Sequence, residues 1–263
     1  MLLPITDLTD YTIQATDGDI GTIDDLYFHT YPDNWRVRYL VVNLGNWLSR
    51  QQVLLNPAVV TAIDTEKQQV VVALNRQQIK DSPDILSDMP ISREKELMLH
   101  HHYQWQPYWT GHPTESMTFG GSTITQELPG HAVSSRMPEG NGQNENDAVA
   151  TDPAFQNPLR STNAVTGYYI KAIDDDIGHV EDFVVDTDNW LIRYLVIDTR
   201  NWLPGREVLI ATDWVQGIDW QHSEVSVGLT KEGVENSPEY DPERLDRAYE
   251  ASLYAHYEQP VPW

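Results

Sequence analysis

The sequence predicts a mainly β protein: two small six-stranded antiparallel β-barrels, each followed by an α-helix, joined by a flexible linker. Three observations support this fold class: an internal duplication, short β-prone runs bounded by turn residues, and one helical pattern after each set of runs. The 263 residues are enough for two domains with a hydrophobic core in each.

The duplication is the clearest feature of the chain. The run Asp33–Val42 returns as Asp188–Ile197, and Asp17–Gly21 returns as Asp174–Gly178. Aligning 17–30 with 174–187 and 33–85 with 188–240 gives 26 identities in 67 positions. The two copies therefore share one structure, and we call them the first and the second repeat.

Each repeat contains six short runs rich in Val, Ile and Tyr, separated by Asp, Asn, Gly and Pro, as is typical of strands joined by turns. Because a closed sheet has no exposed edges, six such strands in about 70 residues favour a small barrel. In the first repeat we expect strands at Tyr11–Ala15, Ile20–Phe28, Val37–Asn43, Val53–Leu55, Val59–Ile63 and Val70–Leu74. In the second repeat we expect them at Gly167–Ala172, Ile177–Asp186, Ile192–Thr199, Glu207–Ile210, Trp214–Asp219 and Val225–Leu229.

A helix is predicted after each set of strands, at Ser92–Gln104 and at Asp241–Tyr257. The second begins with Asp241 as a cap and Pro242 at the first helical position, a recognised start signal. Between the repeats lies a stretch rich in Gly, Pro, Ser, Asn and Gln that buries little apolar surface. The predicted division is a first domain at 1–110, a flexible linker at 111–158 and a second domain at 159–263.

Charge and composition exclude several classes of function. The chain has 17 basic and 40 acidic residues, a net charge of −23, so nucleic-acid phosphates and anionic lipid headgroups would be repelled. Cysteine is absent, which excludes disulfides and thiolate chemistry and suits a cytoplasmic location. No apolar run is long enough to span a membrane, and the start does not resemble a secretory signal.

No catalytic, cofactor-binding or metal site is predicted. The Asp17–Asp19 and Asp174–Asp176 clusters do not continue as a calcium loop and are better explained as turns. Three adjacent histidines at His100–His102 point about 100° apart on a helix and cannot converge on one ion. Acidic pairs recur at equivalent places within strands, and we expect structural ion pairs of Asp25 with Arg38 and of Asp182 with Arg193.

Tryptophan is the remaining signal, with nine residues. Trp47 and Trp202 follow the central strand of each repeat, beside Asn46 and Asn201. A tryptophan in a loop is a favoured interface anchor, although packing within a small barrel is the alternative. The second repeat alone continues with Pro204-Gly-Arg206. Candidate contacts between the repeats or with a partner are therefore Asn46, Trp47, Asn201, Trp202 and Arg206.

Several of these motifs resemble the PRC-barrel family, above all Gly-Asp-Ile-Gly-Thr-Ile-Asp-Asp at 18–25, Trp-x-x-Arg-Tyr-Leu-Val-Val at 35–42 and Asn-Trp-Leu at 46–48. The family includes the cytoplasmic domain of the photosynthetic reaction centre H subunit and a domain of the ribosome-maturation factor RimM. The whole chain resembles the bacterial tandem PRC-barrel proteins. The resemblance implies a six-stranded barrel used as an adaptor and not as an enzyme.

The leading hypothesis is a non-catalytic cytoplasmic adaptor or scaffold that binds a protein partner, without a cofactor. One alternative, implied by the resemblance, is an H-subunit-like accessory protein at the cytoplasmic face of an electron-transfer complex, peripherally associated with the membrane. A third reading is a sensor of a small ligand that uses the cleft between the repeats. Because the second repeat is more acidic and carries the Pro-Gly-Arg loop, we expect it to hold the partner.

Overall fold

The computed structural model describes residues 1–30, 35–45, 51–85, 91–108, 118–119, 122–123, 159–199 and 206–262. The chain divides into two compact units. Met1–Ser92 and Pro158–Trp263 together form the first unit, which therefore contains both repeats, and Arg93–Asn157 form the second. In this second unit the described elements are α3 (Arg93–Tyr103) and the short hairpin β8 (Thr118–Phe119) and β9 (Ser122–Thr123).

The six strands predicted for each repeat are confirmed, with ends that shift by a few residues. In the first repeat they are β2 (Thr12–Ala15), β3 (Gly18–His29), β4 (Arg36–Asn43), β5 (Gln52–Leu55), β6 (Val60–Asp64) and β7 (Gln69–Val72). In the second they are β11 (Tyr169–Lys171), β12 (Asp176–Asp186), β13 (Leu191–Asp198), β14 (Glu207–Ala211), β15 (Val215–Asp219) and β16 (Glu224–Val227). Short helices follow the last strands, α2 (Arg76–Lys80) and α6 (Lys231–Glu235).

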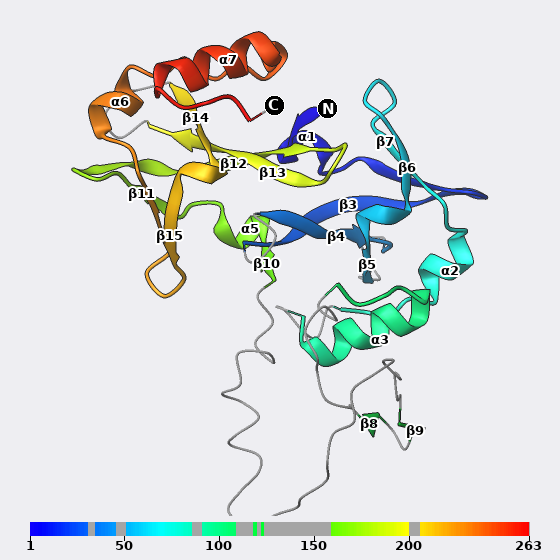
Figure 1. Cartoon of the computed structure of the whole chain (residues 1–263). Coiled ribbons are helices and arrows are strands. Elements are labelled where there is room, and N and C mark those ends of the chain that lie inside the picture. Colours follow the sequence, from blue (N-terminus) through cyan, green and yellow to red (C-terminus); the bar gives the residue numbers. More distant parts are fainter. Residues whose placement is uncertain are drawn as a thin grey trace, which may run out of the picture. The chain divides into compact units, whose positions relative to one another are not determined.

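The predicted antiparallel, closed barrels need correction. In each repeat the last strand lies parallel to the first, β7 beside β2 and β16 beside β11, so the sheet is mixed. The described pairings run β6-β7-β2-β3-β4-β5 and β15-β16-β11-β12-β13-β14, and neither path closes on itself. Instead β4 pairs with β13, so that both repeats belong to one sheet (Figure 1).

Each repeat is completed by a short arm that belongs to the other half of the sequence. The first arm, β1 (Leu2–Pro4) and α1 (Ile5–Leu8), pairs with β12 of the second repeat. The second arm, β10 (Arg160–Ser161) and α5 (Thr162–Val165), pairs with β3 of the first repeat. Figure 1 shows α1 beside β12 and β13, and α5 beside β3 and β4. The division into domains at 1–110 and 159–263 is therefore wrong for these arms, which are exchanged.

Both predicted helices exist, with ends that differ from those expected. The C-terminal one begins as a 3₁₀ turn, Pro242–Arg244, and continues as α7 (Arg247–His256), whose first turn is capped by Asp246 and not by Asp241. Leu253 and Tyr254 of α7 pack on the β12–β13–β14 face, against Tyr194 and Leu209. Burial of these side chains fixes α7 on the second repeat.

Candidate functional site

Of the five residues predicted to contact a partner or the other repeat, the structure describes only Arg206. Asn46, Trp47, Asn201 and Trp202 lie outside the described residues. Arg206 is described and half-buried, and its guanidinium donates to the backbone carbonyls of Glu235 (2.7 Å) and Ser237. The observed contacts of Arg206 therefore tie the start of β14 to the segment after α6.

The predicted ion pairs are replaced by contacts between the arms and the sheet. The Asp25 carboxylate accepts hydrogen bonds from the Ser161 hydroxyl, the Thr162 hydroxyl (2.6 Å) and the Asn163 amide (3.2 Å). The Asp182 carboxylate accepts from the hydroxyl (2.6 Å) and the amide (3.3 Å) of Thr6. In this way each aspartate holds the exchanged arm that lies on its own strand.

Strand register explains why the arginines are not the partners. Asp25 lies opposite Val41, and Asp182 lies opposite Val196. Arg38 precedes Val41 by three residues, and Arg193 precedes Val196 by three. Neither arginine therefore lies opposite the aspartate with which it was expected to pair. Burial raises the pKa of Asp25 and raises that of Asp182 to about 6, and the hydrogen bonds from the arms oppose this shift.

The two repeats meet through a reciprocal pair of backbone hydrogen bonds. The Val37 amide donates to the Trp190 carbonyl (2.8 Å), and the Ile192 amide donates to the Trp35 carbonyl (2.9 Å). Trp35 and Trp190 occupy equivalent positions, and both have positive φ, 63° and 58°. A left-handed conformation is uncommon for a bulky residue. Here the left-handed conformation of the tryptophan directs the backbone of each repeat into the strand that meets the other repeat.

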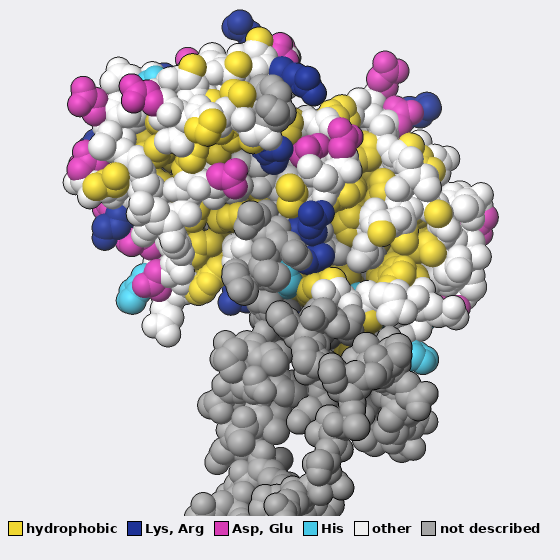
Figure 2. All heavy atoms as spheres, in the orientation of Figure 1, with side chains coloured by type: hydrophobic (Ala, Val, Ile, Leu, Met, Phe, Trp, Pro, Cys, Tyr) yellow, Lys and Arg dark blue, Asp and Glu magenta, His cyan; other side chains and the backbone are white. Residues whose placement is uncertain are grey.

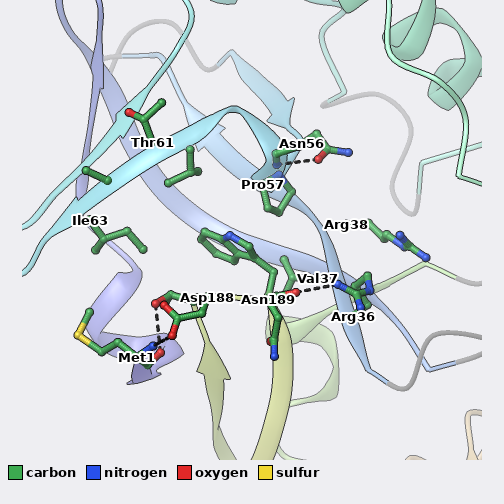
Figure 3. Close-up of a pocket in the computed structure, with 15 residues that line it drawn as sticks. Met1, Arg36, Val37, Arg38, Asn56, Pro57, Thr61, Ile63, Asp188 and Asn189 are labelled. Carbon is green, nitrogen blue, oxygen red and sulfur yellow. Dashed lines mark hydrogen bonds and ion pairs between the residues drawn. The ribbon is translucent and has the colours of Figure 1, made fainter.

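A cleft of about 680 Å³ opens beside this junction, and residues from both repeats line it. The turn Thr187–Trp190 forms one side, with the start of β4 next to it, and β6 with the residues before it forms the other side. Figure 3 shows Arg36, Arg38 and Asn189 near one end of the cleft and Met1 with Ile63 near the other. The cleft is lined by Met1, Arg36, Val37, Arg38, Asn56, Pro57, Ala58, Val60, Thr61, Ala62, Ile63, Thr187, Asp188, Asn189 and Trp190.

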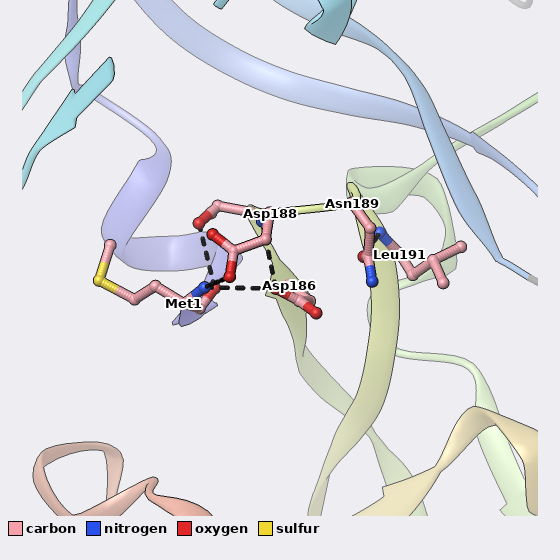
Figure 4. Close-up of polar contacts among 6 residues, drawn as sticks. Met1, Asp186, Asp188, Asn189 and Leu191 are labelled. Carbon is pink, nitrogen blue, oxygen red and sulfur yellow. Dashed lines mark hydrogen bonds and ion pairs between the residues drawn. The ribbon is translucent and has the colours of Figure 1, made fainter. Parts of the chain in front are cut away.

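Polar contacts hold the turn that forms one side of the cleft. The terminal ammonium of Met1 lies 2.9 Å from the Asp188 carboxylate and 3.3 Å from that of Asp186 (Figure 4). Burial lowers the pKa of this amine, but the bonds to Asp188 and Asp186 outweigh it and give a net increase. Arg36 donates to the Asn189 carbonyl (2.7 Å) from the other repeat. These contacts span the junction and limit movement of the turn.

The cleft combines two arginines with a strand at the edge of the described sheet. Arg36 and Arg38 bring two guanidinium groups to the cleft, and Asp188 is the only acidic residue among those that line it. Strand β6 ends the described strand path of the first repeat, and its Thr61 and Ala62 are exposed. An edge strand offers backbone groups with which another strand can pair. On the face that Figure 2 shows, the coloured acidic side chains are scattered and not gathered into one patch.

One known domain family matches part of the chain. Residues 169–228 match the PRC-barrel domain. This stretch extends from β11 to just after β16, so the PRC-barrel match covers all six strands of the second repeat. No curated protein matches the chain. Within the described ranges, no helix is both long and apolar enough to cross a membrane.

The sequence indicated a cleft between the repeats but none of the residues that line it. Arg36 and Arg38 were visible only as part of a strand, and Arg38 was assigned to an ion pair. The tryptophan before the central strand of each repeat is a usable signal, because Trp35 and Trp190 both lie at the junction. The contribution of β6 and Met1 depends on contacts distant in sequence and had no local signal.

Proposed function

We propose that the chain is a non-catalytic adaptor of two PRC-type units, which binds an extended, acidic segment of a protein partner in the cleft between the repeats. The first repeat, outside the matched region, repeats the strand order of the second and is taken as a second PRC-type unit. The observation that carries the proposal is that an edge strand and two arginines line the same cleft. We place the protein in the cytoplasm.

The cleft favours binding over chemistry. Of its charged groups, Asp188 is paired with the Met1 ammonium and Arg36 with a backbone carbonyl, so neither is arranged as an acid–base pair. Thr61 provides a hydroxyl, which donates to the Val71 carbonyl. An acidic peptide that pairs with β6 gains backbone hydrogen bonds, and its carboxylates gain contacts with guanidinium groups.

Two substitutions of opposite charge at Ala62 test this proposal. Ala62 is exposed on β6 and lines the cleft. Ala62→Asp adds a negative charge where an acidic segment would lie, and Ala62→Lys adds a side chain of the opposite charge at the same place. In affinity capture with the full chain as bait, Ala62→Asp should lose the partner and Ala62→Lys should retain it.

Charge reversal on the other side of the cleft provides a second test. Arg36→Glu combined with Arg38→Glu should weaken capture by at least about tenfold, because two attractive contacts become repulsive. Lys80→Glu, on exposed α2, is the control that changes charge away from the cleft. Equal capture by all variants, with unchanged circular dichroism, would disprove the proposed site.

Thermal stabilisation by a small metabolite that fills the cleft would instead favour the sensor hypothesis.

A further inference from the structure

The second repeat brings three potential metal ligands together on one face of its sheet, away from the residues that line the cleft. His179 Nε2 lies 3.6 Å from a Glu181 oxygen and 3.5 Å from an Asp198 oxygen. One ligand atom from each of these residues lies within 4.8 Å of both others. The sequence predicted no metal site, because the three residues come from two strands.

Strand geometry explains the convergence. His179 and Glu181 are two residues apart on β12, and the 3.6 Å between His179 Nε2 and a Glu181 oxygen shows that their side chains leave the same face. Asp198 on β13 is the direct partner of His179. The pairing shifts between Val180 and Asp182, and Glu181 is the extra residue of this bulge. Bulges often redirect a side chain at functional sites.

The distances match those around a small divalent ion. Two ligands about 2.1 Å from one ion, at a tetrahedral angle, lie about 3.4 Å apart. The observed separations of 3.5 and 3.6 Å need only a small adjustment to reach this value. They are also longer than an ordinary N–H···O hydrogen bond, about 2.9 Å. His179 is therefore spaced from each carboxylate as two ligands of one ion would be, and the Glu181 and Asp198 oxygens lie within 4.8 Å of each other.

Exposure changes across the group in the way that an accessible site requires. The Asp198 side chain is only 2 % exposed, that of His179 is 30 % exposed and that of Glu181 is 41 % exposed. Asp198 forms the floor, and the other two ligands border the solvent. An ion can thus enter from solution and be held by a buried carboxylate.

The first repeat has the same strands without the complete set of ligands. At the positions equivalent to His179, Glu181 and Asp198 it has Thr22, Asp24 and Asn43. There, the Gln52 amide donates to Asp24, so a neutral side chain satisfies the carboxylate. The position equivalent to Gln52 is Glu207, opposite Asp198 on β14. The second repeat thus has a histidine in place of a threonine and carboxylates in place of two amides, and both repeats have a carboxylate at the Glu181 position.

We propose that the second repeat binds one divalent transition-metal ion through His179 Nε2 and one oxygen each of Glu181 and Asp198. One imidazole and two carboxylates suit Zn²⁺ and similar ions better than Ca²⁺, which prefers oxygen ligands alone. Three protein ligands leave a coordination position for water or for a group of a partner. The proposal does not depend on the cleft between the repeats.

The test is titration calorimetry of the full chain with Zn²⁺ after treatment with a chelator. The wild type should bind one ion, and the ion should raise the melting temperature. His179→Thr and Asp198→Asn introduce the residues that the first repeat carries at these places, so they preserve the fold. Each should weaken the Kd by at least about tenfold.

His222→Ala is the matched control, because it removes an exposed histidine whose Nδ1 lies 2.7 Å from an Asp219 oxygen. This variant should bind Zn²⁺ like the wild type. The proposal fails if His179→Thr and the wild type bind Zn²⁺ equally, or if only His222→Ala loses the ion. Ca²⁺ binding of equal strength in the wild type and His179→Thr, without Zn²⁺ binding, would also overturn it.

Discussion

The carboxylate of Asp182 holds Thr6, which precedes it by 176 residues. It accepts the Thr6 hydroxyl at 2.6 Å and the Thr6 amide at 3.3 Å. Asp25, the equivalent of Asp182 in the first repeat, accepts the amide of Asn163, the equivalent of Thr6 (3.2 Å). The same contact thus occurs twice, once in each direction, and ties each arm to the other repeat.

Thr6→Ala should destabilise the chain by about 2 kcal/mol at pH 7, because it removes a hydrogen bond to a buried charged group. Chemical denaturation would measure the loss, and hydrogen exchange should rise in β1 and α1. Thr9→Ala is the control, since the Thr9 hydroxyl is exposed and donates to a backbone carbonyl. A cost for Thr9→Ala as large as that for Thr6→Ala would contradict the role given to Asp182.

Asp182 should make stability depend on pH. Burial raises its pKa to about 6 from the ordinary 3.8, so the folded chain holds this proton more tightly than the unfolded chain. The resulting stabilisation is complete below about pH 4 and is lost as the pH rises through about 6. Relative to Asp182→Asn, the wild type should therefore lose about 2 kcal/mol between pH 4 and pH 7.

Asp64→Asn serves as the control for this pH series. The hydrogen bond from Lys67 lowers the pKa of Asp64, so its contribution is lost as the pH falls and not as it rises. Denaturation curves at several pH values would show the difference. A wild type whose stability relative to Asp182→Asn is the same at pH 4 and pH 7 would contradict the raised pKa.

Gly21 and Gly178 should tolerate no side chain. A Cβ on Gly178 would lie 2.1 Å from the Asp198 carbonyl oxygen, and one on Gly21 would lie 2.4 Å from that of Asn43. Each alanine substitution should cost at least about 2 kcal/mol, because a backbone atom of the neighbouring strand must move. Gly217→Ala, with no atom within 4 Å, should change the melting temperature little. If all three alanine variants lost similar stability, the cause would be the general effect of replacing glycine in a strand and not the close contact with the neighbouring strand.

Tyr194 should stabilise the docking of α7. Its hydroxyl donates to the buried Glu250 carboxylate at 2.5 Å. Tyr194→Phe leaves this carboxylate without that donor and should cost about 1–3 kcal/mol. Tyr169→Phe, at a side chain that is 60 % exposed, is the matched control and should cost little. Increased proteolysis within 247–256 in Tyr194→Phe alone would locate the loss at α7.

Local patterns were enough to predict the strands and the last helix. Runs such as Val37–Asn43 alternate with turn residues in both repeats, and the duplication reports the same structure twice. The arms escaped prediction because Leu2–Pro4 and Arg160–Ser161 are too short to show a period. Their pairing depends on strands of the other repeat, which no local window contains.

The sites were harder to predict for the same reason. The sequence predicts ion pairs for Asp25 and Asp182, but their observed partners are residues of the exchanged arms. The cleft joins β6 to a turn of the second repeat, and the proposed metal ligands face one another only after β12 pairs with β13. Sequence spacing carries period-two information within one strand, but it does not give the register between strands.

The exchanged arms also bear on the origin of the chain. The amide contacts of the arms with Asp25 and Asp182, and the two hydrogen bonds at the Trp35–Trp190 junction, occur in pairs in which one contact repeats the other with the two repeats exchanged. Two separate copies of a single-repeat ancestor could therefore form all of them as a symmetric homodimer, with one self-complementary interface. Gene duplication and fusion would have preserved that interface within one polypeptide. Once fused, the halves no longer needed to be identical, and only one of them has the histidine and the aspartate of the His179–Asp198 pair.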